Sequence, residues 1–121
     1  MAEFHIANGG SRASGASTPG DWSLANAYPF TAGAWTTIKA ASASGDSVIF
    51  DDGEYRFTAT LSSGTFFNNG AGTLTIKARN KWQAVFQSAA DGVEMFLWNP
   101  SVGNNTVIFE DILVDGMSIP W

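Results

Sequence analysis

Short apolar runs separated by polar turns repeat along the chain after residue 45. Residues 48–50 (Val-Ile-Phe) form a β-branched and aromatic run, residues 51–53 (Asp-Asp-Gly) form a polar turn, and residues 55–57 (Tyr-Arg-Phe) restart an extended segment. This pattern predicts a buried strand, a tight turn and a second strand. The unit recurs twice, with paired segments at residues 74–77 and 84–86 and at residues 107–109 and 112–114.

The spacing of these units is compatible with two all-β architectures. If Ile49, Ile76 and Ile108 are equivalent positions, the unit recurs at intervals of roughly 30 residues. Coils of roughly this length with a few short strands each are typical of a parallel β-solenoid, in which each coil stacks on the next. Turn signals every 8–12 residues or so are equally typical of an antiparallel β-sandwich, which is the alternative fold.

One helix is expected before the first unit, over residues 34–43. Trp35 and Ile38 fall at helical spacing in this segment, and alanines fill much of the rest. We expect Thr31 to cap the start of the helix and Gly45 to end it in a left-handed conformation. We expect no second helix.

The composition restricts the classes of function. The chain has 121 residues, of which 45% are hydrophobic but only 14% charged, so Ser, Thr, Asn and Gly must supply much of the polar surface. This balance favours an extracellular or virion-associated protein. The net charge is −5, from 11 acidic and 6 basic residues, which argues against binding to nucleic acid. No apolar run approaches the 18 or so residues of a membrane span.

The sequence offers little support for a metal or cofactor site. It has no cysteine and one histidine, His5, so a transition-metal site lacks ligands. Acidic groups at residues 51–54 and 110–115 have the spacing of solvated turns rather than of a calcium loop. No glycine-rich phosphate loop and no Gly-x-Ser-x-Gly elbow is present. We therefore expect no cofactor and no metal.

The order of the segments resembles the start of a known group of proteins. A strand leading into Ala-Asn-Gly-Gly-Ser is followed by a Ser/Gly loop and a helix that ends in Gly45-Asp46, and residues 45–56 then read Gly-Asp-x-Val-x-x-x-x-Gly-x-Tyr-Arg. Residues 74–78 and 105–112 follow as further strands. This arrangement is similar to right-handed parallel β-helix proteins of the pectate-lyase-like superfamily, which includes enzymes of the chondroitinase B and alginate lyase type and phage tailspikes.

The resemblance implies a fold and a domain organisation. We expect an all-β chain that forms a short right-handed parallel β-helix of about three coils with one N-terminal capping helix. In this interpretation residues 1–121 are a single β-solenoid domain. Residues 1–44 form its N-terminal cap, and residues 45–121 form its coils.

The resemblance carries no catalytic residue to this chain. In the similar enzymes, catalytic bases and calcium carboxylates lie on coils beyond the third, and this sequence contains no matching positions. We therefore expect a non-catalytic, carbohydrate-related or assembly module. The alternative is a small polysaccharide lyase or hydrolase acting on acidic glycans, which would use Asp52 and Glu110 with the basic group of Lys77, Arg79 and Lys81.

The aromatic residues suggest where a polysaccharide would bind. Five tryptophans are many for this length, and exposed indoles provide platforms for sugar rings, whereas buried ones fill the core. We expect Trp35 in the core. Trp82 and Trp98, which stand beside polar residues, are the expected binding residues, together with Tyr55 and Lys81.

The end of the third unit predicts association. Residues 107–114 are apolar and strand-like, and few residues follow them in this sequence. A last coil without a cap exposes unpaired strand edges and apolar side chains. We therefore expect a homo-oligomer or the continuation of a longer β-helix.

Overall fold

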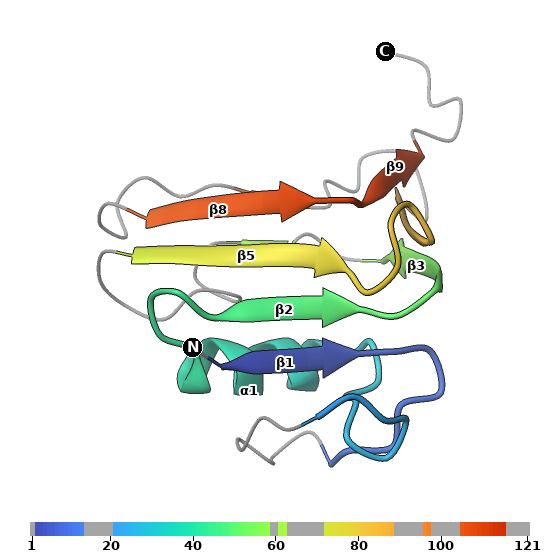
Figure 1. The fold of residues 1–121 in the computed structure, drawn as a ribbon, viewed down its shortest axis with the longest axis horizontal. Coiled ribbons are helices and arrows are strands. Elements are labelled where there is room, and N and C mark those ends of the chain that lie inside the picture. Colours follow the sequence, from blue (N-terminus) through green and yellow to red (C-terminus); the bar gives the residue numbers. More distant parts are fainter. Residues whose placement is uncertain are drawn as a thin grey trace.

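The structure is a computed structural model that describes residues 2–13, 21–58, 61–62, 72–88, 96–97 and 105–115. This part of the chain holds one helix and nine strands, so it is mostly β (Figure 1). The helix α1 spans Ala32–Ala41. The strands are β1 (Glu3–Ile6), β2 (Ser47–Phe50), β3 (Gly53–Phe57), β4 (Leu61–Ser62), β5 (Gly72–Ala78), β6 (Ala84–Ser88), β7 (Phe96–Leu97), β8 (Asn105–Glu110) and β9 (Leu113–Asp115).

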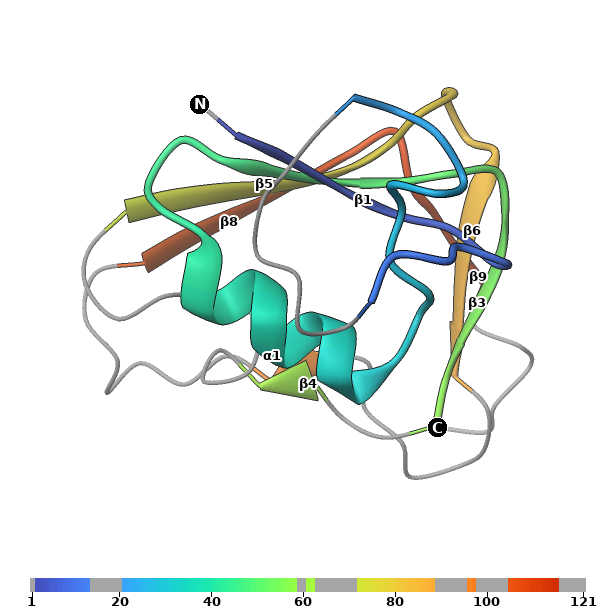
Figure 2. The ribbon, with the colours of Figure 1, turned by 90° about the horizontal axis from the view of Figure 1, so that it is seen from below.

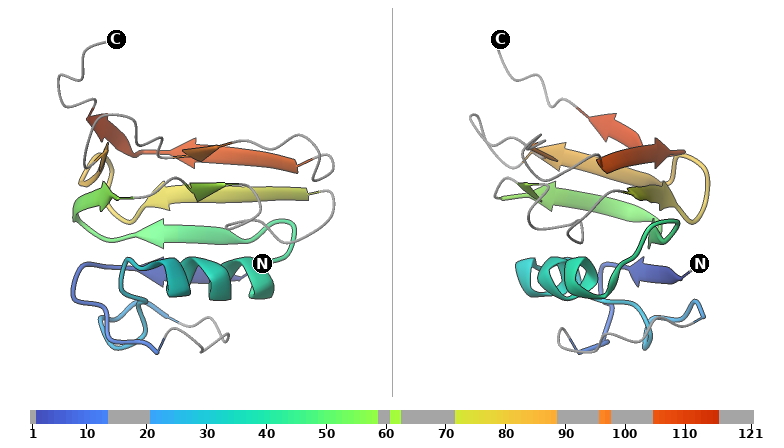
Figure 3. Two further views of the ribbon diagram at one scale, coloured as in Figure 1. Left: turned by 180° about the vertical axis from the view of Figure 1, so that it is seen from behind. Right: turned by 90° about the vertical axis from the view of Figure 1, so that its left-hand side faces the viewer.

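The strands form three parallel sheets. Their orders are β1-β2-β5-β8, β3-β6-β9 and β4-β7. Strands that are neighbours in a sheet are far apart in sequence, and they lie at successive levels (Figures 1 and 3). Viewed from below, the sheets lie on different sides of the interior (Figure 2). Among the described strands every pairing is parallel, so the alternative of an antiparallel sandwich is wrong.

The polar turn after β2 explains why no hairpin forms. The backbone N–H of Asp51 donates to the carbonyl of Ile6 in the level below, at 2.9 Å. The N–H of Gly53 donates to the carbonyl of Gln83 in the level above, also at 2.9 Å. Because the turn is bonded to the levels on either side, β3 leaves the sheet of β2 instead of folding back onto it.

The register between levels differs by a single position from the sequence-based alignment. Val48 pairs with Ile76, and Ile76 pairs with Phe109, so each level is one position longer than the alignment of isoleucines implied. The equivalence of Ile49, Ile76 and Ile108 was therefore wrong. A shift of one position moves a side chain to the other face of the sheet, which places Ile49 on the face away from the core.

The predicted helix exists but begins and ends earlier than expected. Thr31 caps it as predicted, since its Oγ1 accepts a hydrogen bond from the N–H of Ala34 at 3.1 Å. Ala34, Trp35 and Ile38 are buried, so the prediction that Trp35 is a core residue is confirmed. Gly45 has a φ of 93° but does not end the helix. It lies beyond the C-cap, in a turn closed by the Asp46 N–H and the Ala43 carbonyl.

The lowest level of the molecule is closed by segments of the chain that precede β2. Tyr28 forms a bridge to the outer edge of β1: its N–H donates to the His5 carbonyl, and its carbonyl accepts from Ala7. Helix α1 lies at the level of β1 (Figures 1 and 3). The buried carboxylate of Asp46 accepts hydrogen bonds from the N–H groups of Ala2 and Ala43, at 2.8 Å each, and so joins the start of β1 to this turn.

Aromatic rings from several levels meet in the core around Phe50. The Phe50 ring centroid lies 4.8 Å from that of Tyr55 and 4.7 Å from that of Phe86, both in edge-to-face arrangements. Trp35 of the helix lies 6.0 Å from Phe50, so this one ring connects the helix to two of the sheets. Such pairs add about 0.5–1.5 kcal/mol to the effect of area burial.

Replacement of Phe50 by alanine should therefore be much more destabilising than the same change at Phe109, which is 48% exposed. We expect Phe50→Ala to lower the free energy of unfolding by about 3–5 kcal/mol and Phe109→Ala by about 1–2 kcal/mol. Urea denaturation followed by circular dichroism measures both values. Equal losses would contradict the placement of Phe50 at the centre of the core.

Candidate functional site

The uppermost level, formed by β8 and β9, exposes apolar side chains. In the levels below, the side chains at two of the paired positions are buried. Phe109 pairs with the buried Ile76, and Val114 pairs with the buried Phe86. Paired residues of parallel strands point to the same face, yet Phe109 is 48% and Val114 58% exposed. We call β8 and β9 the open layer. Among the described residues it holds four of the six exposed large hydrophobic side chains, namely Ile108, Phe109, Leu113 and Val114.

The two ends of the stack therefore differ. At the lower end the bridge of Tyr28 covers part of the edge of β1. At the upper end no described strand pairs with the outer edge of β8 or β9. Exposed strand edges together with an apolar surface mark a site at which another strand can be added. The open layer is thus the clearest interaction surface of the described part of the chain.

A second feature is a hollow of about 410 Å³ on the face of the long sheet that points away from the core. We call it the outer-face cleft. In its floor, His5, Ile49, Lys77 and Glu110 form one row across the four paired strands. The other lining residues are Glu3, Trp22, Ala78, Arg79 and Asp111.

Trp22 forms one wall of the outer-face cleft and is held from two sides. The ring of the buried His5 meets it edge to face at a centroid distance of 5.7 Å, and the Arg79 guanidinium carbon lies 4.3 Å from its centroid. Arg79 also pairs with Asp51, at 2.7 Å between Nη2 and Oδ1 and 2.8 Å from Nε. Lys77 has no ion pair within 4.0 Å among the described residues.

The basic and acidic groups named from the sequence are only partly brought together. Lys77 and Arg79 both line the outer-face cleft, but Lys81 is not among its lining residues. Asp52 accepts a hydrogen bond from the side chain of Asn80 at 2.9 Å, whereas Glu110 lies in the cleft opposite Lys77. Asp52 is thus not among the residues that line the cleft with Glu110.

Trp82 lies on the surface, as expected of a binding residue. It is 62% exposed, and the Lys81 ammonium lies 4.9 Å from its ring centroid. Its φ of 62° is unusual for an aromatic residue. The conformation is fixed by a hydrogen bond of 2.7 Å from the Trp82 N–H to the carbonyl of Asp111, which belongs to the corner between β8 and β9. Such retained strain is frequent at functional positions.

Tyr55, which was also expected to bind, does not join this surface. Tyr55 is fully buried, and its hydroxyl donates to the carbonyl of Asp51 at 2.8 Å. It is a core residue because its ring packs among Phe30, Phe50 and Phe86 while the buried hydroxyl finds a backbone partner. Trp98 lies outside the described residues.

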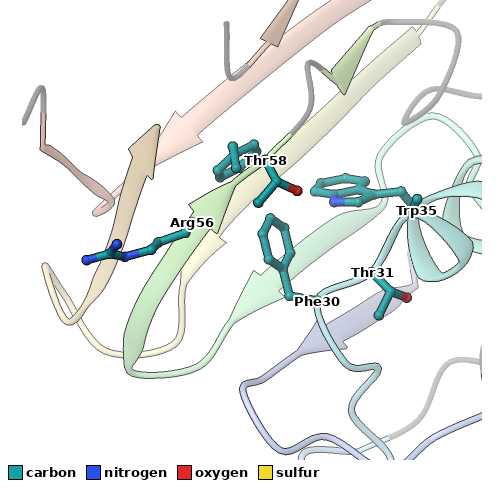
Figure 4. Close-up of a pocket in the computed structure, with 7 residues that line it drawn as sticks. Phe30, Thr31, Trp35, Arg56 and Thr58 are labelled. Atoms are coloured by element: carbon teal, nitrogen blue, oxygen red, sulfur yellow. The ribbon is translucent and has the colours of Figure 1, made fainter. Parts of the chain in front are cut away.

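A smaller hollow of about 250 Å³ lies where the start of α1 meets the end of β3 (Figure 4). Figure 4 shows Phe30, Trp35 and Thr58 around it, while the side chain of Arg56 points away. It is thus mainly aromatic, without a converging charge, and below the size of most ligand sites, which is about 300–1,000 Å³. We assign it to imperfect packing at the edge of the core.

No other chemical centre stands out in the part of the chain that the structure describes. Within that part no three histidine, aspartate or glutamate side chains gather as metal ligands would. None of its helices has the length and apolar character needed to cross a bilayer.

The outer-face cleft was not predicted from the sequence. Trp22 reaches the sheet through a loop, and the error in register concealed the row of His5, Ile49 and Lys77. The correct register would have revealed this row, because it places a histidine and a lysine on the same outward-pointing column. No local signal connects Trp22 to that column.

Comparisons of the chain with protein-family models, with curated proteins and with solved structures found no match. The resemblance to pectate-lyase-like β-helix proteins therefore stays a prediction.

The buried hydroxyl of Tyr55 makes stability sensitive to alkaline pH. Burial, and secondarily the charge of Asp51, raises the pKa of Tyr55 far above its ordinary value. An unfolded tyrosine ionises at about pH 10. The stabilisation that comes from keeping the buried hydroxyl of Tyr55 protonated is therefore fully present below that pH and is lost as the pH rises further. We expect the free energy of unfolding to fall above about pH 10, and to fall less in Tyr55→Phe. Urea denaturation at about pH 8 to 11 measures this. An equal alkaline loss in both proteins would contradict the assignment.

Proposed function

We propose that the protein is a non-catalytic assembly module at the capped end of a parallel β-helix. In this proposal the strands of successive levels are successive coils, the segments before residue 45 close one end, and the open layer receives a further layer of strands. The apolar side chains and the strand edge of the open layer would be covered equally well in a larger β-helix or in an oligomer.

The order in which the chain visits the three sheets supports the β-helix. From β2 the chain passes to β3 and then β4, and from β5 it passes to β6 and then β7. Each strand of the second series pairs in parallel with its counterpart in the first. Paired positions on β2, β5 and β8 are separated by roughly 30 residues, which is the size expected for coils.

The exposure of the open layer is the observation that carries the assembly role. Phe109 and Val114 continue columns of side chains that are buried in every level below. Both positions therefore suit burial, and the described residues contain no layer that covers them. Support for a non-catalytic role comes from the absence of Asp52 from the cleft that Glu110 lines and from the ion pair that occupies Arg79.

An apolar fluorescent dye tests the open layer without assuming a partner. Because Phe109 and Val114 lie in an exposed apolar surface, we expect 8-anilinonaphthalene sulfonate to bind and to gain fluorescence. Val114→Glu should reduce this signal severalfold while leaving the circular dichroism spectrum unchanged. Leu24→Glu, at a residue that is 53% exposed and outside the open layer, is the matched control. At high dilution, where no second molecule covers the open layer, dye binding that is absent, or equally reduced by both variants, would refute the proposed function.

Binding of an acidic polysaccharide is the second candidate function, and a specific observation favours it. Trp82 is exposed, held in an unusual conformation and accompanied by Lys81, while Lys77 offers a further ammonium group in the outer-face cleft. An indole face beside a cation suits a sugar ring that carries a carboxylate. An extracellular or virion-associated location would agree with this role and is part of the proposal.

Alanine variants test the polysaccharide. Titration with alginate, pectate and chondroitin oligosaccharides, followed by calorimetry, should show that Trp82→Ala weakens binding about fivefold or more, which corresponds to about 1 kcal/mol per stacked ring. The effect of Lys77→Ala on affinity shows whether the outer-face cleft contributes to binding in addition to the surface around Trp82. Leu24→Ala is the control. Affinity that is unchanged by Trp82→Ala would exclude Trp82 as a sugar platform.

A further inference from the structure

We propose that the partner of the open layer is a second copy of this chain, placed end to end so that the two β8 strands pair antiparallel about a twofold axis. This inference rests on the proposed function, because it names the occupant of the same surface. Two features of the described residues support it, namely the difference between the two ends of the stack and the alternation of side chains along β8, and the size of the exposed apolar area sets its strength.

The difference between the two ends favours a symmetric contact. A head-to-tail stack would need an open strand edge at the lower end, but Tyr28 is bridged to part of the edge of β1 there. Two upper ends, in contrast, each offer the outer edge of β8, with which no described strand pairs. A contact that uses the same surface on both copies closes after two subunits, as in twofold dimers.

The alternation of side chains along β8 selects the register. Val107 and Phe109 face the core side, as their partners Leu74 and Ile76 do, while Ile108 lies on the outer face. In an antiparallel pair, residues that stand opposite each other lie on the same face. This condition is met when the axis passes midway between one residue and its own copy on the other strand, so that this residue stands opposite itself.

An axis at Ile108 satisfies both the apolar and the charged positions. It sets Ile108 opposite its own copy and Val107 opposite Phe109, which brings apolar side chains together on both faces. It also sets Glu110 opposite Thr106, so that the carboxylates of the two copies do not meet. An axis at residue 110 would instead oppose the two Glu110 side chains, which is unfavourable.

The exposed apolar area sets the strength of the contact. A phenylalanine side chain exposes roughly 150–250 Å² when fully accessible. The four half-exposed side chains of the open layer therefore contribute on the order of several hundred Å² per copy, which is less than the roughly 800 Å² per partner of a standard interface. We expect a reversible dimer with a dissociation constant of about 1–100 µM.

Disulfide trapping tests the geometry, since the natural chain contains no cysteine. Cα atoms of directly opposite residues in an antiparallel pair are about 4.5–5.5 Å apart, within disulfide range. Ile108→Cys should therefore form a covalent dimer on mild oxidation. Thr106→Cys alone should not, but a mixture of Thr106→Cys with Glu110→Cys should form a heterodimer. Leu24→Cys, exposed outside the open layer, is the control for random collision.

Sedimentation of the cysteine-free chain gives a second measurement that does not depend on the cysteine variants. We expect a monomer–dimer equilibrium and at least a tenfold weaker dimer in Ile108→Lys, because two like charges would then face each other at the axis. A dimer that the Ile108→Cys variant does not cross-link would overturn the pairing of the two β8 strands about Ile108, and a chain that stays monomeric at about 100 µM would overturn the second copy as the partner. If dye binding remained sensitive to Val114→Glu in that case, the proposed assembly role would stand with a different partner.

Discussion

The hydrogen bonds between levels are the constraint on which the rest of the molecule depends. In parallel sheets built from distant strands, each strand finds its backbone partners only in the level above and the level below. Even the corner after β2 is satisfied in this way, through Ile6 below and Gln83 above. A structure of this kind is locally stable in its middle, and its two terminal levels have to be completed by something else. The lower level is completed by Tyr28 and α1, and the upper level presents Phe109 and Val114.

The features that could be predicted from the sequence are those that depend on neighbours along the chain. The strands β2 and β3, the turn between them and the cap at Thr31 were recognised because each is specified within a few residues. The parallel arrangement was expected only through the resemblance, since turn signals alone do not say whether β3 returns to β2. The register was missed because Val48 and Ile49 are both β-branched and both buried, so hydrophobicity alone could not assign them to opposite faces.

The candidate binding residues, too, could be predicted only where neighbours along the chain decide their position. Trp82 was correctly placed on the surface because polar residues surround it in the sequence, although its role in binding is still a proposal. Tyr55 has the same local surroundings, yet it belongs to the core because distant aromatic rings enclose it and the Asp51 carbonyl accepts its hydroxyl. The contact of Trp22 with His5 and Arg79 joins three segments of the chain, and no pattern within any one of them announces it.

The bridge between Tyr28 and β1 has a consequence for the solubility of the protein. It occupies backbone groups at an edge that would otherwise be as ready to pair as that of β8. A molecule with one open edge can associate only until that edge is used, whereas a molecule with two complementary open edges can grow without limit into fibres. In the proposed twofold dimer, loosening of the segment around Tyr28 would expose more of the edge of β1 and so allow end-to-end growth into filaments.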